Sequence, residues 1–345
     1  MTSQPRIEGI DEAIRVADAY VDANNYEHAR DILRRSLSQN PNDPSLLASY
    51  ARVEIVLGNN WQAAHSAYAS LAGAPNYEFA MRIYALALYN LGRQHDGLLM
   101  AWRAVTSHPN QAAPLRLYAQ LLHGTWQLPS ALIVIDNALY LDPHDVDALI
   151  RRGAILHDMG RSDESDAAYQ AALALDPANA QALNDLAVHR LRRFKLGPAL
   201  RGFLGAAGSD PEYGNLSRWN IGVALQRVLM FVTIGAGVLS GLLACAAGLH
   251  SEGHPTATLR VFTGLLTVAL IVVLGWLFRQ IPRNIMVSVL KEQPFTALRI
   301  GHALAAVVAG AWVTAIPWPV GFIAVGGMLT LLALVIVRVG FFIGK

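Results

Sequence analysis

The sequence predicts an all-α protein in two parts: an α-solenoid of about six helix pairs, followed by a four-helix transmembrane domain. Two observations predict this fold. Proline recurs at 34-residue intervals, at Pro41, Pro75, Pro109, Pro143, Pro177 and Pro211. A fixed period of that length is typical of stacked helical repeats, in which each period is one supersecondary unit. After about residue 213 the chain changes to long apolar runs, which are typical of membrane-spanning helices.

The two parts differ in charge. Residues 1–213 contain 18 basic and 23 acidic residues, whereas residues 214–345 contain 9 basic and 2 acidic residues. An acidic repeat region argues against nucleic acid as a partner, because phosphates need a basic binding surface. The single cysteine, Cys245, excludes an intramolecular disulfide. It lies in an apolar run, where we expect a small buried hydrophobe.

Counting back from each proline divides the first part into six units, 10–43, 44–77, 78–111, 112–145, 146–179 and 180–213. The eighth position of every unit is small: Ala17, Ala51, Ala85, Ala119, Gly153 and Ala187. Small residues at fixed places allow two helices to approach closely. Asn24, Gly58, Gly92 and Gly160 are turn signals in the middle of four units. Each unit is therefore predicted to be a helix, a turn and a second helix that ends near its proline.

These features resemble the tetratricopeptide repeat family. The period, the small-residue positions and the Leu-Asp-Pro ends at 141–143 and 175–177 match its pattern, over 204 residues. The resemblance implies antiparallel helix pairs stacked in a right-handed superhelix, whose concave groove binds peptides or helices of other proteins. One departure matters. The family's carboxylate clamp needs Lys and Asn where this chain has Ile14 and Asp18, so that clamp is not expected.

The resemblance places the groove on the first helix of each unit. The residues that it assigns to a partner-binding groove are Arg52, Arg82, Tyr89, Arg116, Gln120, His123, Arg151, His157 and Asn184. The arginines predict a cationic groove suited to an acidic peptide or a carboxylate, through forked hydrogen bonds. The alternative is that arginine is simply the usual basic residue of this chain, which has only three lysines.

The second part contains four apolar runs, at about 228–249, 261–278, 300–316 and 320–337, and none of them contains Asp, Glu, Lys or Arg. Each approaches the ~20 residues that cross a bilayer as a helix. The N-terminus lacks the apolar core of a signal peptide, which predicts cytoplasmic repeats. Eight basic residues then flank the runs on the inner side and only Arg260 on the outer side. This bias predicts a multi-pass inner-membrane protein with both termini in the cytoplasm.

Three features of the second part leave alternatives open. The inner loop 279–299 has the apolar spacing of a short helix in the headgroup layer; it is either a connector or a docking surface. The outer turn Pro317-Trp318-Pro319 is predicted to be tight. Small residues such as Gly237 and Gly241 allow close helix packing, within this chain or in a homo- or hetero-oligomer.

No catalytic, metal or cofactor site is predicted. The sequence has no phosphate-binding Gly-Lys-Ser/Thr loop, no nucleophile elbow and no zinc-ligand spacing. We therefore expect residues 1–213 to be a cytoplasmic repeat domain, 214–227 a short linker and 228–345 a membrane domain. The favoured function is a membrane-anchored, non-enzymatic scaffold that recruits a protein partner to a bacterial inner-membrane complex. The alternative is an accessory subunit of a membrane transporter or envelope-synthesis enzyme, held through its transmembrane helices.

Overall fold

The computed structural model describes residues 9–315 and 321–343, and the secondary structure in those ranges is helical throughout. Contacts along the chain divide it into two compact units, Met1–Asp176 and Pro177–Lys345. The all-α prediction is confirmed, and each unit is described separately below.

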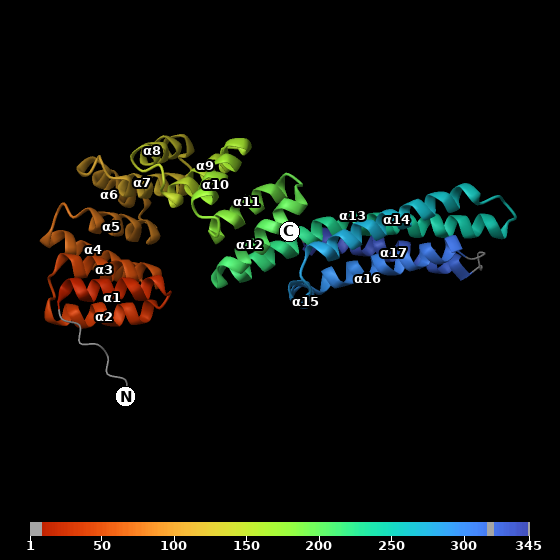
Figure 1. Ribbon diagram of the computed structural model, residues 1–345, viewed down its shortest axis with the longest axis horizontal. Coiled ribbons are helices and arrows are strands. Elements are labelled where there is room, and N and C mark those ends of the chain that lie inside the picture. Colours follow the sequence, from red (N-terminus) through yellow and green to blue (C-terminus); the bar gives the residue numbers. More distant parts are fainter. Residues whose placement is uncertain (1–8, 316–320, 344–345) are drawn as a thin grey trace, which may run out of the picture. The chain divides into compact units, whose positions relative to one another are not determined.

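The first unit contains five helix pairs (Figure 1). In every pair the first helix has 13 residues and the second has 14. The first helices are α1 (Ile10–Asp22), α3 (Pro44–Val56), α5 (Glu78–Asn90), α7 (Ala112–Gly124) and α9 (Val146–Asp158). The second helices are α2 (Tyr26–Gln39), α4 (Asn60–Gly73), α6 (Gln94–Ser107), α8 (Leu128–Leu141) and α10 (Ser162–Leu175).

The small residues of the repeat lie where helices meet. Ala17, Ala51, Ala85 and Ala119 are fully buried. Gly153 holds the same position in the fifth pair, and a Cβ there would lie 2.8 Å from the ring of Tyr169. Because that distance is shorter than a normal carbon–carbon contact, glycine is the residue that allows α9 and α10 to pack with Tyr169 between them.

The second unit begins with a sixth helix pair, α11 (Ala180–Arg192) and α12 (Leu196–Ser209). It continues with α13 (Pro211–Ser251), α14 (Ala257–Gln280), α15 (Arg283–Glu292), α16 (Pro294–Ala315) and α17 (Gly321–Ile343). Helix α13 contacts α12 along its first part and α14, α16 and α17 along the rest. Buried Phe203 of α12 and Ile221 and Leu225 of α13 belong to one hydrophobic core.

Residues 214–227, which the sequence suggests as a short linker, are part of helix α13 in the structure. Gly214 and Asn215 are weak helix formers, but burial of Ile221 and Leu225 against α12 outweighs that local preference. Pro211 is the first residue of α13, a position where proline is favoured because its missing N–H has no helical partner. The expected division of the chain at residue 213 stays a prediction, since the contacts group α11 and α12 with α13.

Within residues 9–315 and 321–343, three helices are long and apolar enough to cross a membrane, over Gly214–Ser251, Ala257–Gln280 and Pro294–Trp312. The expected runs 228–249 and 261–278 lie within the first two, and the expected run 300–316 lies in α16 as far as the described residues reach. The fourth expected run lies in α17, where the segment Ile323–Val339 is apolar but shorter than the other three. The expected turn Pro317-Trp318-Pro319 lies outside the described residues.

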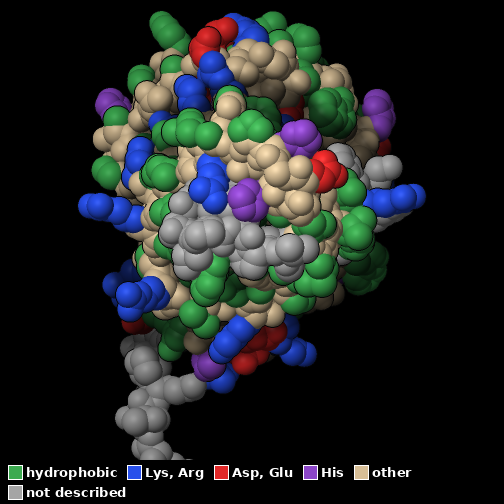
Figure 2. Space-filling model, turned by 90° about the vertical axis from the view of Figure 1, so that its right-hand side faces the viewer, with side chains coloured by type: hydrophobic (Ala, Val, Ile, Leu, Met, Phe, Trp, Pro, Cys, Tyr) green, Lys and Arg blue, Asp and Glu red, His purple; other side chains and the backbone are tan. Residues whose placement is uncertain are grey.

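Small residues join these apolar helices within the chain. A Cβ at Gly237 of α13 would lie 2.9 Å from the Cβ of Ala333 in α17. A Cβ at Gly326 of α17 would lie 2.7 Å from the carbonyl oxygen of Ser240. Cys245, expected to be buried, is exposed instead, because its side of α13 is not covered by α14, α16 or α17. Figure 2 looks onto the end where α13 and α14 join and shows hydrophobic side chains interspersed with histidine and charged ones.

The connection between α14 and α16 contains the short amphipathic helix α15. Its Met286 and Val289 are buried in the same hydrophobic core as α13 and α14. The apolar side of this helix therefore packs against protein, as a connector does.

Candidate functional site

The first helices of the first unit form a continuous surface, which we call the inner face. Each of α1, α3, α5 and α7 contacts the first helix of the next pair as well as its own second helix, and α9 completes the row. Among the described residues, no two second helices of neighbouring pairs contact each other as closely as the first helices do. Because first helices are spaced more closely than second helices, the array curves with the first helices on its inside.

The N-terminal part of the inner face carries two arginines around an aromatic ring. The guanidinium carbon of Arg52 lies 5.9 Å from the ring centre of Phe79, and that of Arg82 lies 5.4 Å from the same ring. Both distances are in the range of cation–π attraction. Arg52 also forms an ion pair with Asp18, which holds the same position one unit earlier, and Arg82 pairs with Glu78. Phe79 itself is half-buried.

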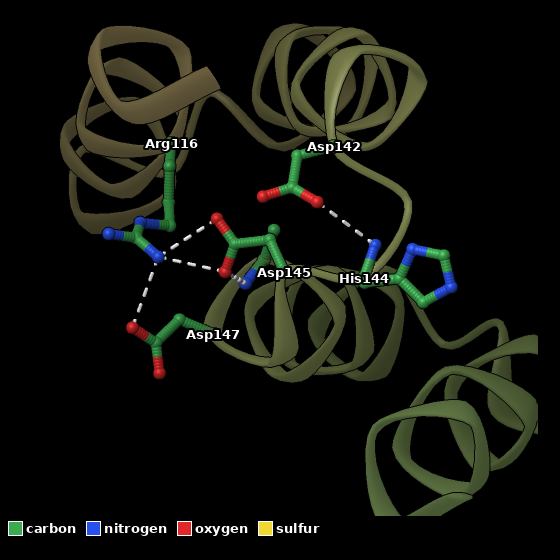
Figure 3. Close-up of polar contacts among 6 residues, drawn as sticks. Arg116, Asp142, His144, Asp145 and Asp147 are labelled. Atoms are coloured by element: carbon green, nitrogen blue, oxygen red, sulfur yellow. Dashed lines mark hydrogen bonds and ion pairs between the residues drawn. The ribbon is translucent and has the colours of Figure 1, made fainter. Parts of the chain in front are cut away.

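The middle of the inner face is organised by Arg116 (Figure 3). Its Nη1 donates to both carboxylate oxygens of Asp145 at 2.8 Å and to Asp147 at 3.1 Å. Asp145 is also the N-cap of α9, where it accepts the backbone N–H of Ala148 at 3.0 Å. One carboxylate therefore starts a helix and joins it to the preceding unit.

Two further predicted residues contact neighbouring helices. His123 Nε2 lies 2.8 Å from Asp158 Oδ2, across from α7 to α9. Tyr89 lies against Gly124, where a Cβ would be only 2.1 Å from the tyrosine hydroxyl. Gln120 is half-buried on α7. All three side chains lie on the expected helices, and His123 and Tyr89 also contact the next repeat unit.

The remaining predicted residues are less accessible. Burial lowers the pKa of Arg151, and the neighbouring Arg116 lowers it further. His157 is half-buried near the end of α9. Asn184 belongs to the second unit and is only 4% exposed, and its side chain accepts a hydrogen bond from Asn220 of α13 at 2.8 Å. Asn184 therefore holds α11 against α13 in the structure and is not exposed on a binding surface.

The electrostatics of the inner face differ from the cationic groove that the sequence suggests. Arg52, Arg82 and Arg116 each have a carboxylate partner, so this face has alternating charges. The repeat pattern does not by itself identify Asp18, Glu78 and Asp145 as their partners. One signal was available: Asp18 and Arg52 occupy the same position of consecutive units, which places them side by side in a stack.

A second feature is an open hollow of about 880 Å³ between α2, α3 and the turn that joins α3 to α4. Its lining includes Arg30 and Arg34 of α2, Tyr50 and Glu54 of α3, and Trp61 of α4. Burial and a hydrogen bond with Glu54 raise the pKa of Tyr50 to about 12, so the phenol stays neutral at physiological pH. No group of three or more potential metal-ligating residues was found in the described part of the chain.

Comparisons with known proteins agree with this geometry. Models of the tetratricopeptide repeat family match residues 10–53 and 146–179. The chain contains tetratricopeptide repeats. Such repeats indicate a protein–protein interaction scaffold, and proteins built from them are typically not enzymes. The comparison with curated proteins found no match.

Two solved structures of repeat proteins share the fold. Yeast Tom70 is 18% identical with a TM-score of 0.50, and the match covers 62% of this chain and 46% of Tom70. A chain of the APC/C hetero-tetramer Cut9–Hcn1 is 15% identical with a TM-score of 0.52, covering 60% of this chain and 42% of that one. At these identities the similarity shows the fold alone.

Proposed function

We propose that the protein is a membrane-anchored scaffold whose tetratricopeptide repeats bind a segment of a protein partner on the inner face. The observation that carries this proposal is the arrangement of Arg52 and Arg82 around Phe79. It offers an aromatic surface and two guanidinium groups on neighbouring units. Aromatic and arginine side chains contribute most to binding at protein interfaces.

The charge pairing defines the kind of partner. Arg116 contacts Asp147, whose side chain is 66% exposed, and Arg52 contacts Asp18, which is 45% exposed. Exposed ion pairs of this kind contribute about 1 kcal/mol or less, so a partner carboxylate can replace these acids at little cost. We therefore propose a partner segment that combines acidic residues, which exchange for Asp18 and Asp147, with an apolar residue placed over Phe79.

The apolar helices provide the anchor in this proposal. Only 28% of the most apolar stretch of α14 is buried against other parts of the protein. Val261, Leu265, Val268 and Val272 are among the side chains of this helix that are exposed. Each exposed apolar Å² costs roughly 25 cal/mol in water, which a bilayer removes. We propose four spans, with α17 as the fourth, in a bacterial inner membrane, and both termini in the cytoplasm. Anchoring raises the effective concentration of the partner at the membrane, which strengthens weak contacts.

The test uses cross-linking and mass spectrometry in native membranes. The double variant Arg52→Gln/Arg82→Gln removes both cations over Phe79 and is expected to weaken partner capture at least tenfold, because two contacts of about 1 kcal/mol are lost. The matched control is Arg103→Gln, which removes an exposed arginine from the second helix α6. Circular dichroism checks that both variants keep their helix content.

The outcomes separate the two proposed functions. Loss of a partner with the double variant, but not with the control, supports recruitment by the inner face. A partner set that is identical for wild type, double variant and control contradicts it. If that unchanged set includes a stoichiometric integral-membrane protein, the accessory-subunit alternative is favoured, since the exposed apolar surface of α14 is then the binding surface.

A further inference from the structure

The turn inside each helix pair has one residue in the left-handed backbone region. These six residues recur at 34-residue intervals and have φ between 56° and 80°: Asn24, Gly58, Gly92, Trp126, Gly160 and Phe194. Glycine and asparagine adopt this conformation readily. A bulky side chain there costs roughly 1–2 kcal/mol. Trp126 and Phe194 are therefore exceptions that need a reason.

Phe194 buries only a minor part of its surface in return for this strain. Its side chain is 66% exposed at the tip of the turn between α11 and α12. Strained residues that the fold does not require are often retained for function. An exposed aromatic ring at a turn is suited to binding another apolar surface.

The chemistry around Phe194 is basic. Lys195 follows it directly and Arg201 lies two turns further on in α12, and both side chains are exposed. Basic residues in the last turn of α11, such as Arg190 and Arg192, have a structural explanation, because they interact favourably with the helix dipole. Lys195 and Arg201 lie beyond the end of α11, so the dipole of that helix does not explain them.

The turn lies beside the end of an apolar helix. A Cβ built at Gly197, three residues after Phe194, would be 3.7 Å from the ring of Trp276 in α14 and 3.8 Å from the Arg201 guanidinium. Arg227 of α13 donates to the backbone oxygen of Leu191 at 3.2 Å, which fixes the other side of the turn. Trp276 lies about one turn before the end of α14, and the exposed Arg279 is the last residue but one of that helix. Tryptophan followed by arginine is typical of the membrane–water boundary.

We propose that the α11–α12 turn binds the surface of an anionic phospholipid membrane. Phe194 inserts at the level of the headgroups beside Trp276, while Lys195, Arg201 and Arg279 contact lipid phosphates. This inference rests on the proposed membrane anchoring and goes beyond it, because it gives a repeat turn its own lipid contact. Each basic side chain near an anionic surface strengthens binding by about a factor of five, and an aromatic ring adds to it at the interface.

The full chain is reconstituted in nanodiscs of phosphatidylcholine alone or with about one third phosphatidylglycerol, and amide hydrogen exchange is followed over residues 190–197. The turn is expected to exchange roughly tenfold more slowly in the anionic nanodiscs, because at least two basic side chains engage the lipid. The variant Lys195→Glu/Arg201→Glu is expected to exchange equally in both lipids. Phe194→Gly relieves the backbone strain, so this variant is expected to fold. The difference in its exchange rate between neutral and anionic nanodiscs is expected to be much smaller than in the wild type.

Trp126 provides the matched control, since it holds the same turn position and is also exposed. Exchange over residues 124–128 is expected to be independent of lipid charge, and Trp126→Gly is expected to leave the 190–197 result unchanged. If α13 and α14 exchange as if in water, the anchoring proposal fails and this inference with it. If the amides of α13 and α14 are protected but exchange over residues 190–197 does not depend on lipid charge, only the proposed lipid contact of the turn is contradicted.

Discussion

At the scale of single residues, Trp126 shows how a turn position constrains side-chain choice. Its φ of 59° matches that of glycine or asparagine in four other units, and its side chain is 71% exposed. Trp126→Gly is expected to stabilise the first unit by about 1 kcal/mol, since relief of the strain exceeds the extra freedom of glycine in the unfolded chain. Denaturant unfolding of the full chain, followed by circular dichroism, measures this.

Gly58→Ala is the converse control for that prediction. No atom lies within 4 Å of a Cβ at Gly58, so the substitution adds backbone strain without a clash. It is expected to destabilise by about 1 kcal/mol. A loss of stability in Trp126→Gly would mean that the exposed indole makes a stabilising contact.

Asp185 gives a prediction about pH. Burial raises its pKa, although a hydrogen bond from Asn184 partly opposes this. Because the folded state resists ionisation of the carboxyl, the stability that this group contributes is complete below its unfolded pKa and falls as pH rises through its folded pKa. Asp185→Asn keeps an acceptor for Asn184 and cannot ionise. Its thermal midpoint in detergent, relative to wild type, is expected to increase between pH 4 and pH 8; a constant difference would contradict this.

At the scale of elements, close packing of α13 and α17 depends on one glycine of a Gly-Gly pair. A Cβ at Gly326 would lie 2.7 Å from a backbone oxygen and 2.9 Å from a backbone nitrogen of α13, whereas one at Gly327 would contact nothing within 4 Å. Gly326→Ala is therefore expected to destabilise the second unit by about 1–3 kcal/mol, because backbone atoms cannot move aside easily. Gly327→Ala is the control and is expected to stabilise by about 1 kcal/mol, which is the gain in helix propensity alone.

The measurement for this pair is thermal unfolding in a mild detergent, with the two alanine variants purified side by side. An equal effect of both substitutions would show that helix propensity, rather than the contact between α13 and α17, determines the result. Alanine favours the helix over glycine by about 1 kcal/mol at either position, so the difference between the variants isolates the contact.

At the scale of elements, the sequence predicted some features of the fold and not others. The helix pairs follow from the small residues and turn signals, because these act within one period of the chain. Residues 214–227, expected to be a short linker, are helical in the structure: Gly214 and Asn215 have low helix propensity, but burial of Ile221 and Leu225 against α12 favours the helix. Cys245 was misjudged for a related reason: an apolar run does not indicate which of its sides is covered.

At the scale of the whole molecule, the sequence predicted which helices carry the inner-face arginines better than it predicted the charges around those arginines. Position within the repeat identified Arg52, Arg82 and Arg116, whereas their carboxylate partners depend on how neighbouring units stack. Asp145 pairs with Arg116 from 29 residues away, a separation that no single-unit pattern reveals. The assignment of the inner face as the partner-binding groove remains a proposal that the Arg52/Arg82 variant tests.

The topology of the chain is the last prediction. Basic residues such as Arg227, Arg279 and Lys291 lie at one side of the apolar helices, and Arg260 lies at the other. Since positive residues favour the cytoplasmic side, we expect the α13–α14 connection on the outside and the repeat turns inside. Single cysteines at His254 and Trp126, in a Cys245→Ala background, test this with a membrane-impermeant thiol reagent on intact spheroplasts. Labelling is expected at position 254 and, only after lysis, at position 126; the reverse pattern would invert the topology and place the proposed binding face outside the cytoplasm.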